Sequence, residues 1–337
     1  MKVLITGGAG FIGSHLTDLL LQDGHEVWVL DDLSTGSLRN IAHLDDHPRF
    51  HLVVHSVLEP AIVNELVHKS DRVFHLAAAV GVKNIVEQPA RTLHVNLEGT
   101  STVLEACRIF QRPVLVTSTS EVYGDHRTET PLRESDRRMY GATTQKRWAY
   151  ADSKAMDEFL ALAYHEEYGL DTVLVRLFNT VGPRQTGHYG MVIPRFVERA
   201  ITGRQIEIYG DGRQTRCFCH VADSVRALRD LMDALPATSG EIYNVGAPNQ
   251  TSIVDLAERV KRLVGSTSPT AYVPFDRVYG TGIDDMLHRV PCTEKVQAAI
   301  GWSAGLSLDE ILDDVVADVT MRLELPESER AYEVVAA

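Results

Sequence analysis

Short apolar segments alternate with helical patterns through the first half of the chain. Apolar, largely β-branched runs occur at 3–5, 25–30, 50–54, 73–78, 114–119 and 173–178. Strands that are apolar on both faces and are spaced by helices are typical of a parallel sheet covered on each side. Because crossovers between parallel strands are right-handed, this pattern predicts a doubly wound α/β sheet of the Rossmann type.

The pattern changes after residue 179, where short strands mix with helices. The strands are expected at 206–209 and 242–245, and the clearest helices at 252–264 and 307–323. We therefore predict a Rossmann domain over residues 1–180 and a smaller α/β domain over 181–325, with some segments crossing back to the first. Residues 326–337 are expected to form a flexible tail.

Composition and charge exclude several classes of protein. The 337 residues include 44% apolar and 23% charged residues, close to the average of soluble globular proteins, so disorder throughout is excluded. With 33 Lys+Arg against 46 Asp+Glu, the net charge is −13, which argues against binding to nucleic acid or an anionic membrane. No apolar run approaches the roughly 20 residues of a membrane span.

Cysteine and histidine spacing gives no support for a metal site. The cysteines form no C-x-x-C motif and are expected to be reduced thiols in a cytoplasmic protein: Cys107, Cys217, Cys219 and Cys292. Four histidines recur every fourth residue, at His43, His47, His51 and His55. Pro48 breaks any single helix through them, and no cysteine or acidic ligand spacing accompanies them. We predict no metal.

A glycine-rich turn follows the first predicted strand directly. Residues 6–13 read Thr-Gly-Gly-Ala-Gly-Phe-Ile-Gly, a G-x-x-G-x-x-G spacing between a strand and a helix. Gly7 permits the tight turn, Gly10 lets the backbone approach a pyrophosphate, and Gly13 lets helix and strand pack closely. An acidic pair ends the next strand about 20 residues further on, as expected for a ribose-binding carboxylate. Because its first member, Asp31, would repel a 2′-phosphate, we predict NAD rather than NADP.

Tyr150 and Lys154 stand four residues apart in a segment with helical periodicity that ends at Gly169. This spacing places both side chains on one helix face. The pKa of a free tyrosine, about 10, makes it a poor base at neutral pH, and a nearby ammonium favours the phenolate. Residues 117–124, Thr-Ser-Thr-Ser-Glu-Val-Tyr-Gly, add hydroxyl groups at the carboxyl end of a predicted strand, where doubly wound folds bind ligands.

Together these segments resemble the extended short-chain dehydrogenase/reductases that act on nucleotide sugars, in particular their 4-epimerase branch. The resemblance runs from Lys2 to about Leu323 and also includes 178–184 (Phe-Asn-Thr-Val-Gly-Pro-Arg) and 214–216 (Gln-Thr-Arg). It implies NAD as cofactor, a UDP-sugar substrate and a Thr–Tyr–Lys catalytic group. In this group Tyr150 takes the proton of the sugar 4-hydroxyl. Lys154 binds the nicotinamide ribose and lowers the pKa of the tyrosine, and Thr119 hydrogen-bonds the sugar 4-oxygen.

The resemblance also implies which residues contact each ligand. For NAD they are Gly7, Gly10, Phe11, Ile12, Gly13, Asp31, Asp32, Ser34, Thr35, Gly36, Ser56, Val57, Leu76, Ala77, Ala78, Asn96, Thr117, Tyr150 and Lys154. For the UDP-sugar they are Thr119, Ser120, Glu121, Tyr150, Asn179, Arg184, Met191, Val192, Glu207, Tyr209, Arg216 and Asp285. The family arginine that precedes the position of Asp285 is replaced by Gly282, so Arg289 either substitutes for it or is structural.

Three reactions share these residues and begin with oxidation at C4: 4-epimerisation, 4,6-dehydration and glucuronate decarboxylation. Dehydratases carry Asp-Glu after the threonine, so Ser120-Glu121 sets dehydration aside; UDP-glucuronate decarboxylases show this same Ser-Glu pair. Arg184 is usually absent from epimerases of neutral sugars, and we expect it beside the C6 carboxylate of an acidic sugar. Its other interpretation is a loop arginine ion-paired to a surface acid.

Residues 182–190 and 289–291 look more like the epimerase-type members of the family. The expected reaction is therefore the conversion of UDP-glucuronate to UDP-galacturonate. UDP-glucuronate decarboxylase and UDP-glucose 4-epimerase are the alternatives, and an NAD-binding sensor without chemistry is the alternative to an enzyme. Such a sensor need not retain Thr119, Tyr150 and Lys154 in register.

Two helical segments, near 84–110 and 148–168, carry apolar residues over more than one stripe. In the family, two such helices from each subunit pair into a four-helix interface, so the resemblance implies a homodimer. A helix buried within a monomer gives the same pattern.

Overall fold

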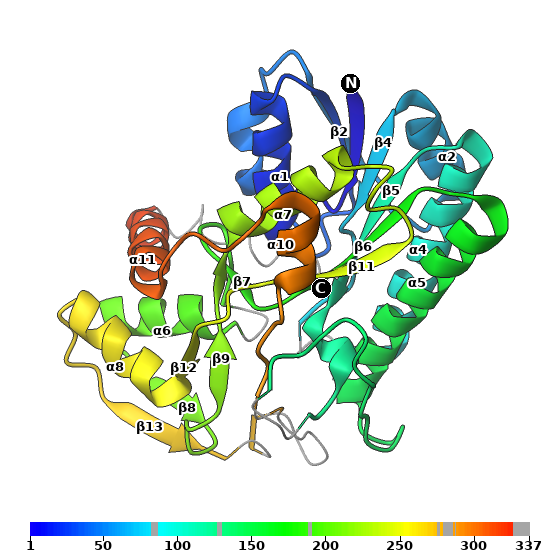
Figure 1. The fold of residues 1–337 in the computed structure, drawn as a ribbon. Helices are drawn as coiled ribbons and strands as arrows, with labels where there is room; N and C mark the ends of the chain where they lie inside the picture. Colours follow the sequence, from blue (N-terminus) through cyan, green and yellow to red (C-terminus); the bar gives the residue numbers. More distant parts are fainter. Residues whose placement is uncertain are drawn as a thin grey trace.

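Seven parallel strands form the central sheet of the protein (Figure 1). The computed structural model describes residues 1–81, 87–126, 130–187, 191–274, 277–278, 286 and 288–325. Every neighbouring pair in the sheet runs parallel. Across the sheet the strands are ordered β11 (Glu241–Val245), β6 (Thr172–Leu177), β5 (Val114–Thr119), β4 (Arg72–His75), β1 (Lys2–Thr6), β2 (Glu26–Asp31) and β3 (Phe50–Val54).

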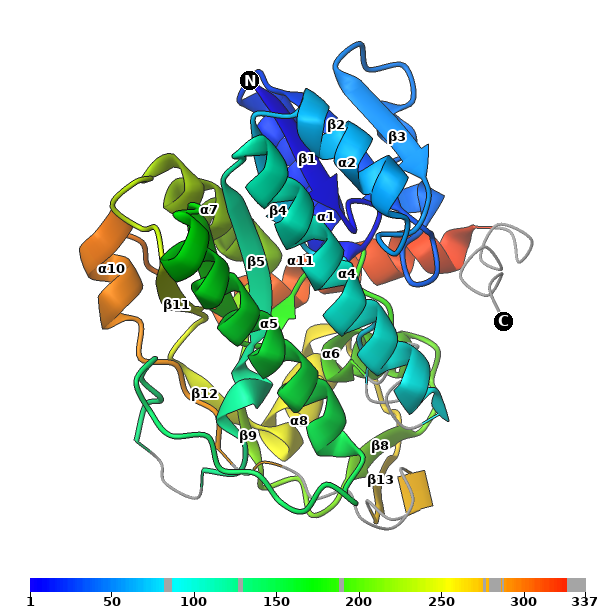
Figure 2. The same ribbon diagram turned by 90° about the vertical axis from the view of Figure 1, so that its right-hand side faces the viewer.

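Helices cover both faces of this sheet (Figures 1 and 2). One face carries α1 (Phe11–Gln22) and α7 (Val221–Asp233), and the other carries α2 (Pro60–Lys69), α4 (Pro89–Phe110) and α5 (Arg147–Tyr168). Successive side chains of a strand point to opposite faces. Val3 and Ile5 of β1 accordingly belong to the core cluster with α1 and α7, whereas Leu4 belongs to the cluster with α2, α4 and α5. The predicted doubly wound α/β fold is confirmed.

The strand order reverses between β1 and β4. From β1 the chain proceeds outward through β2 and β3, then returns to the other side of β1 and continues through β4, β5 and β6. The loops after β1 and β4 therefore leave the sheet in opposite directions. A crevice opens between them at the carboxyl ends of the strands, which is where doubly wound proteins bind ligands.

A smaller α/β unit lies below this edge of the sheet in Figure 1. Strands β8 (Ile206–Tyr209) and β13 (Thr270–Val273) pair in parallel. A separate apolar core joins β8 to α6 (Val192–Ile201), α8 (Ile253–Leu263) and α11 (Leu308–Glu324). Two short strand pairs connect the units: β7 (Thr180–Val181) with β10 (Cys219–His220), and β9 (Thr215–Cys217) with β12 (Gln250–Ser252). Later in the chain comes the short helix α10 (Glu294–Ile300).

The observed elements differ from the expected ones mainly at their ends. The strand expected at 73–78 stops at His75, and the next residues enter the loop that borders the crevice. The strand expected at 242–245 crosses back to the large sheet as β11, beside β6. The domain boundaries themselves stay a prediction, and the tail expected at 326–337 lies outside the described residues. Among the described residues, no helix combines the length and apolarity that a bilayer crossing requires.

Candidate active site

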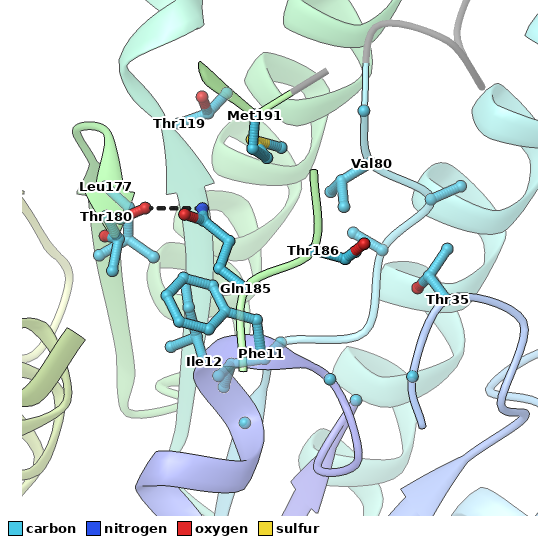
Figure 3. Close-up of a pocket in the computed structure, with 18 of the residues that line it drawn as sticks. Phe11, Ile12, Thr35, Val80, Thr119, Leu177, Thr180, Gln185, Thr186 and Met191 are labelled. Carbon is cyan, nitrogen blue, oxygen red and sulfur yellow. Dashed lines mark hydrogen bonds between the residues drawn. The ribbon is translucent and has the colours of Figure 1, made fainter. Parts of the chain in front are cut away.

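A cleft of about 990 Å³ lies at the carboxyl ends of the strands, between the large sheet and the smaller unit. Figure 3 shows Phe11 and Ile12 at the start of α1, Thr35 on another side of the cleft and Thr119 at the far end. Most of the residues named from the sequence line it: Gly7, Gly10, Phe11, Ile12, Gly13, Asp31, Asp32, Ser34, Thr35, Gly36, Val57, Leu76, Ala77, Ala78, Thr117, Thr119, Ser120, Glu121, Tyr150, Lys154, Asn179, Arg184, Met191, Val192, Tyr209 and Arg216.

The glycine loop is closely packed on itself and on the loop that follows β4. Gly7 adopts a φ of 75°, in the left-handed region, and a Cβ there would lie 2.8 Å from the amide nitrogen of Ala77. A Cβ on Gly13 would overlap the carbonyl oxygen of Gly7 and lie 2.8 Å from the Cα of Gly8. The first amides of a helix have no intrahelical partner, and those of α1 begin at this loop. The loop therefore fits the pyrophosphate of a dinucleotide.

Asp31 at the end of β2 stands where a ribose is expected. Its Oδ2 accepts from the Ala9 amide at 2.9 Å and its Oδ1 from the Leu33 amide at 2.9 Å, so the carboxylate is held in place. Burial raises the pKa of Asp31, and the backbone amides oppose this change. A carboxylate has acceptor positions beyond these two bonds, so Asp31 can still accept from ribose hydroxyls.

Two residues named for the cofactor do not line the cleft. Asn96 acts on the loop instead: its Oδ1 accepts from the Ala79 amide at 2.8 Å, and its Nδ2 donates to Ser153 Oγ at 3.1 Å. Ser56 takes part in a local turn, where its Oγ accepts from the Leu58 amide at 3.2 Å. The structure thus joins Asn96 to the cleft through the loop it supports and leaves Ser56 outside.

Thr119, Tyr150 and Lys154 come together at the end of β5, against which α5 packs. The Thr119 hydroxyl accepts from the Glu121 amide at 3.2 Å, and a hydrogen bond between Thr119 and Tyr150 lowers the pKa of the phenol. Burial, followed by the charges of Glu121 and Asp157, raises the pKa of Tyr150 above its ordinary value. The Lys154 ammonium forms a buried ion pair with Asp157 at 2.7 Å. Sequence reasoning missed Asp157, although a carboxylate three residues after the lysine signals such a pair.

Arg289 is buried next to the catalytic group. One guanidinium nitrogen lies 3.4 Å from Ser120 Oγ and 3.5 Å from Glu121 Oε1, and the other lies 3.4 Å from Asn179 Oδ1. Its side chain is only 8% exposed and lines the cleft. From the sequence Arg289 was expected to substitute for the family arginine before the position of Asp285 or to be structural. The structure places it beside the Ser120-Glu121 pair, and its role stays a prediction.

Arg184 lies against α1 and α11. Its guanidinium pairs with Asp18 at 2.7 Å, and its amide donates to Asp318 Oδ1 at 3.2 Å. These contacts agree with the interpretation of Arg184 as a loop arginine paired to an acid. The expected role of Arg184 at a sugar carboxylate stays a prediction.

The end of the cleft formed by the smaller unit contains an aromatic ring stacked on a cation. The Arg195 guanidinium lies 3.9 Å from the centre of the Tyr209 ring, and both residues line the cleft. Sequence reasoning missed Arg195 and the α11 residue Met321, which also lines the cleft. Glu207 does not line it, because its carboxylate pairs with Arg199 at 3.1 Å. Asp285 lies outside the described residues.

The histidines and cysteines considered as metal ligands have separate partners. His43 contacts Asp18, His51 stacks on Trp28, and His55 contacts Glu59. All four cysteines are buried free thiols. Within the described part of the chain, no three acidic, histidine or cysteine side chains are grouped as a metal ion would require.

The fold agrees with comparisons to known proteins. Residues 4–315 match the GDP-mannose 4,6 dehydratase family, and the chain belongs to this family of nucleotide-sugar-modifying enzymes. It is 38% identical over 316 residues to the UDP-N-acetyl-alpha-D-glucosaminuronate decarboxylase of Bacillus cytotoxicus, covering 94% of this chain and 96% of the relative.

Two further relatives represent the two competing reactions. UDP-glucuronic acid decarboxylase 1 of Xenopus tropicalis is 35% identical over 325 residues, covering 96% of this chain and 73% of the relative. The solved structure of UDP-glucuronic acid 4-epimerase from Bacillus cereus, in complex with UDP-glucuronic acid and NAD, superposes with a TM-score of 0.86 at 26% identity. This superposition covers 95% of this chain and 99% of the other.

The dinucleotide site can be tested at Gly13. The Gly13→Ala variant is expected to bind NAD more than about tenfold more weakly. Relieving the overlap with the Gly7 carbonyl must move the loop, and such overpacking costs about 1–3 kcal/mol. Equilibrium titration with NAD gives the measurement. The Gly305→Ala variant is the control, because its Cβ would meet Asp223 at an ordinary 3.6 Å. Equal NAD affinity of both variants would contradict the placement of the pyrophosphate.

Proposed function

We propose that this protein is an NAD-dependent decarboxylase of a UDP-hexuronic acid. The observation that carries the proposal is the buried cluster of Ser120, Glu121 and Arg289 beside Thr119 and Tyr150. A guanidinium in this cluster would pair with the carboxylate of an acidic sugar that the catalytic group orients. The decarboxylase relatives at 38% and 35% identity support the same reaction. The epimerase expected from residues 182–190 and 289–291 becomes the second candidate.

The first step is oxidation of the sugar at C4. Bound NAD supplies the acceptor for the hydride from this carbon. Tyr150 takes the proton of the 4-hydroxyl, and the Thr119 hydroxyl holds the 4-oxygen against it. Lys154 favours the phenolate form of Tyr150 by its charge.

The second step is loss of the carboxylate. A 4-keto hexuronate is a β-keto acid, so the electrons of the C5–C6 bond can pass to the ketone oxygen as carbon dioxide leaves. Arg289 would hold the C6 carboxylate by charge-assisted hydrogen bonds and fix this bond relative to the carbonyl. The hydroxyls of Thr119 and Tyr150 would stabilise the negative charge that develops on the 4-oxygen. The enolate would then take a proton at C5. Return of the hydride to C4, with the proton held by Tyr150 returned to the 4-oxygen, would give the UDP-pentose.

UDP-glucuronate 4-epimerisation remains the second candidate because of the likeness to the Bacillus cereus epimerase. An epimerase must keep the C5–C6 bond out of alignment while the ketone turns over. A sensor without chemistry is disfavoured, since the structure brings the hydroxyl, phenol and ammonium of the catalytic group into one cleft.

The product formed from UDP-glucuronate, or from its 2-acetamido analogue, distinguishes these candidates. We expect the enzyme to form a UDP-pentose and release carbon dioxide. Proton NMR of the sugar identifies the product. The Tyr150→Phe variant is expected to lose at least about a hundredfold in rate, the usual contribution of a general base. UDP-galacturonate as the product would establish the epimerase instead, and unchanged turnover by Tyr150→Phe would remove the proposed base.

A matched pair of variants tests which arginine holds the sugar carboxylate. Arg289→Gln is expected to reduce kcat/KM about a hundredfold, because hydrogen bonds to a charged group contribute about 1.5–3 kcal/mol. Arg184→Gln is expected to change kcat/KM much less, since its guanidinium pairs with Asp18. The steady-state rate of carbon dioxide release is measured for both, with circular dichroism as a check on folding. The opposite order of effects would assign the carboxylate to Arg184.

We further propose that the protein is a homodimer through α5. Met156 and Phe159 lie one helical turn apart on this helix and are 54% and 57% exposed. Burial of these side chains is favourable, and a second copy of α4 and α5 would supply it.

Sedimentation of the double variant Met156→Glu/Phe159→Glu tests this interface. The unmodified chain is expected to sediment at twice 37.4 kDa and the double variant as the monomer. Leu263→Glu, which changes an exposed leucine of α8, is the control and should remain dimeric. Monomeric behaviour of the unmodified chain would exclude the dimer.

A further inference from the structure

The catalytic lysine is paired with a carboxylate behind the cleft wall. Lys154 Nζ donates to Asp157 Oδ2 at 2.7 Å, and the two side chains are 3% and 1% exposed. Lys154 lines the cleft, whereas Asp157 is not among the lining residues. Asp157 therefore contacts the lysine from the protein side and leaves the cleft side of the ammonium to ligands.

A row of hydrogen-bonding groups continues from this pair toward the glycine loop. His75 of β4 lies 2.7 Å from Thr6 Oγ1 and 3.1 Å from Thr100 Oγ1 of α4. Burial raises the pKa of the Asp157 carboxyl, and the Lys154 ammonium and then the Thr100 hydroxyl oppose this change. Burial and the Lys154 charge lower the pKa of His75 to about 3, so this ring is neutral at physiological pH. Lys154 is thus the cationic partner of Asp157.

A buried ion pair of this kind restricts both members. Removing a carboxylate from a buried pair leaves an uncompensated charge, so the lysine has a strong reason to stay in one position. A carboxylate close to the ammonium also offsets part of the field that the ammonium exerts on the phenol of Tyr150.

We propose that Asp157 is a positioning residue: it anchors the Lys154 ammonium at the cleft wall and sets the ionisation of Tyr150 by opposing the lysine charge. The proposal rests on the tyrosine-dependent C4 oxidation of the proposed function. It adds a third side chain, one turn beyond Lys154 on α5, to the two that the Tyr-x-x-x-Lys pattern contains.

Two carboxylates act on the phenol of Tyr150 by their charges. Glu121 comes from the turn after β5 and pairs with Arg289 at 3.5 Å, and Asp157 comes from the same helix as Tyr150 and pairs with Lys154. The Asp157 and Glu121 charges both raise the pKa of Tyr150. Replacing Asp157 by a neutral side chain leaves Glu121 and Arg289 unchanged, so it isolates one contribution.

The first measurement needs no sugar and is therefore independent of which reaction the enzyme catalyses. The tyrosinate absorbance of the NAD-saturated enzyme is titrated against pH, with Tyr150→Phe subtracted to isolate Tyr150. In the Asp157→Asn variant the midpoint is expected about one pH unit lower, a usual effect of removing a nearby like charge. An unchanged midpoint would overturn the proposal, and Asp157→Ser provides the same test if the Asn variant does not fold.

The second measurement separates the effect of the Asp157 charge from its effect on the position of the Lys154 ammonium. In Asp157→Asn, the acid limb of the pH profile of kcat/KM for the sugar substrate should move to lower pH. In Asp157→Glu, which keeps the charge, the acid limb should return toward the pH of the unmodified enzyme. Asp157→Ala, which removes the anchor as well as the charge, should in addition lower the plateau rate. Asp152→Asn, an exposed carboxylate on the same helix, is the control and should leave the profile in place. A superimposable profile for Asp157→Asn would overturn the role in ionisation, and an unaltered plateau for Asp157→Ala would overturn the anchoring role.

Discussion

Both faces of the central sheet are buried, and this constraint determines where the chemistry of the protein can take place. A sheet covered by α1 and α7 on one face and by α2, α4 and α5 on the other exposes little but its edges and strand ends. Because all seven strands run parallel, their carboxyl ends meet along one edge. The strand order reverses at β1 and β4, so the loops that follow separate there and open the cleft. The glycine loop, Asp31 and Thr119 reach this edge at strand ends or a helix start, and Tyr150 and Lys154 reach it from α5.

Within the cleft, the position of two arginines separates the candidate reactions. Both a decarboxylase and an epimerase of an acidic sugar need a cation for the carboxylate, but they differ in how freely the 4-keto sugar moves. Arg289 is buried and contacts Ser120, Glu121 and Asn179, which themselves line the cleft. Arg184 contacts Asp18 and Asp318 on two helices. A cation fixed beside the catalytic group would hold the C5–C6 bond of the sugar in one orientation relative to the 4-ketone. Decarboxylation needs this fixed orientation, and this is the physical basis for preferring it.

Helix α5 carries an unusual concentration of buried charge for a surface-facing helix. Lys154 pairs with Asp157, and the next residue, Glu158, forms a buried pair with Arg176 of β6 at 2.7 Å. The Glu158–Arg176 pair ties the helix to the sheet, because neither charge can be moved into the apolar core without loss of its partner. The same helix presents Met156 and Phe159 outward. Catalytic geometry, attachment to the sheet and a candidate interface are thus combined in one element.

The sequence by itself determined the fold class, the glycine loop and the Thr119–Tyr150–Lys154 group. These features depend on local spacing: strand and helix periodicity, glycines at fixed offsets and a four-residue helical repeat. Only the tertiary structure decided the partners of Arg184 and Arg289, the return of residues 241–245 to the large sheet and the position of Glu207 outside the cleft. The physical reason is that a long charged side chain bonds to whichever opposite charge the packing of distant elements brings within reach, and no local pattern encodes that choice.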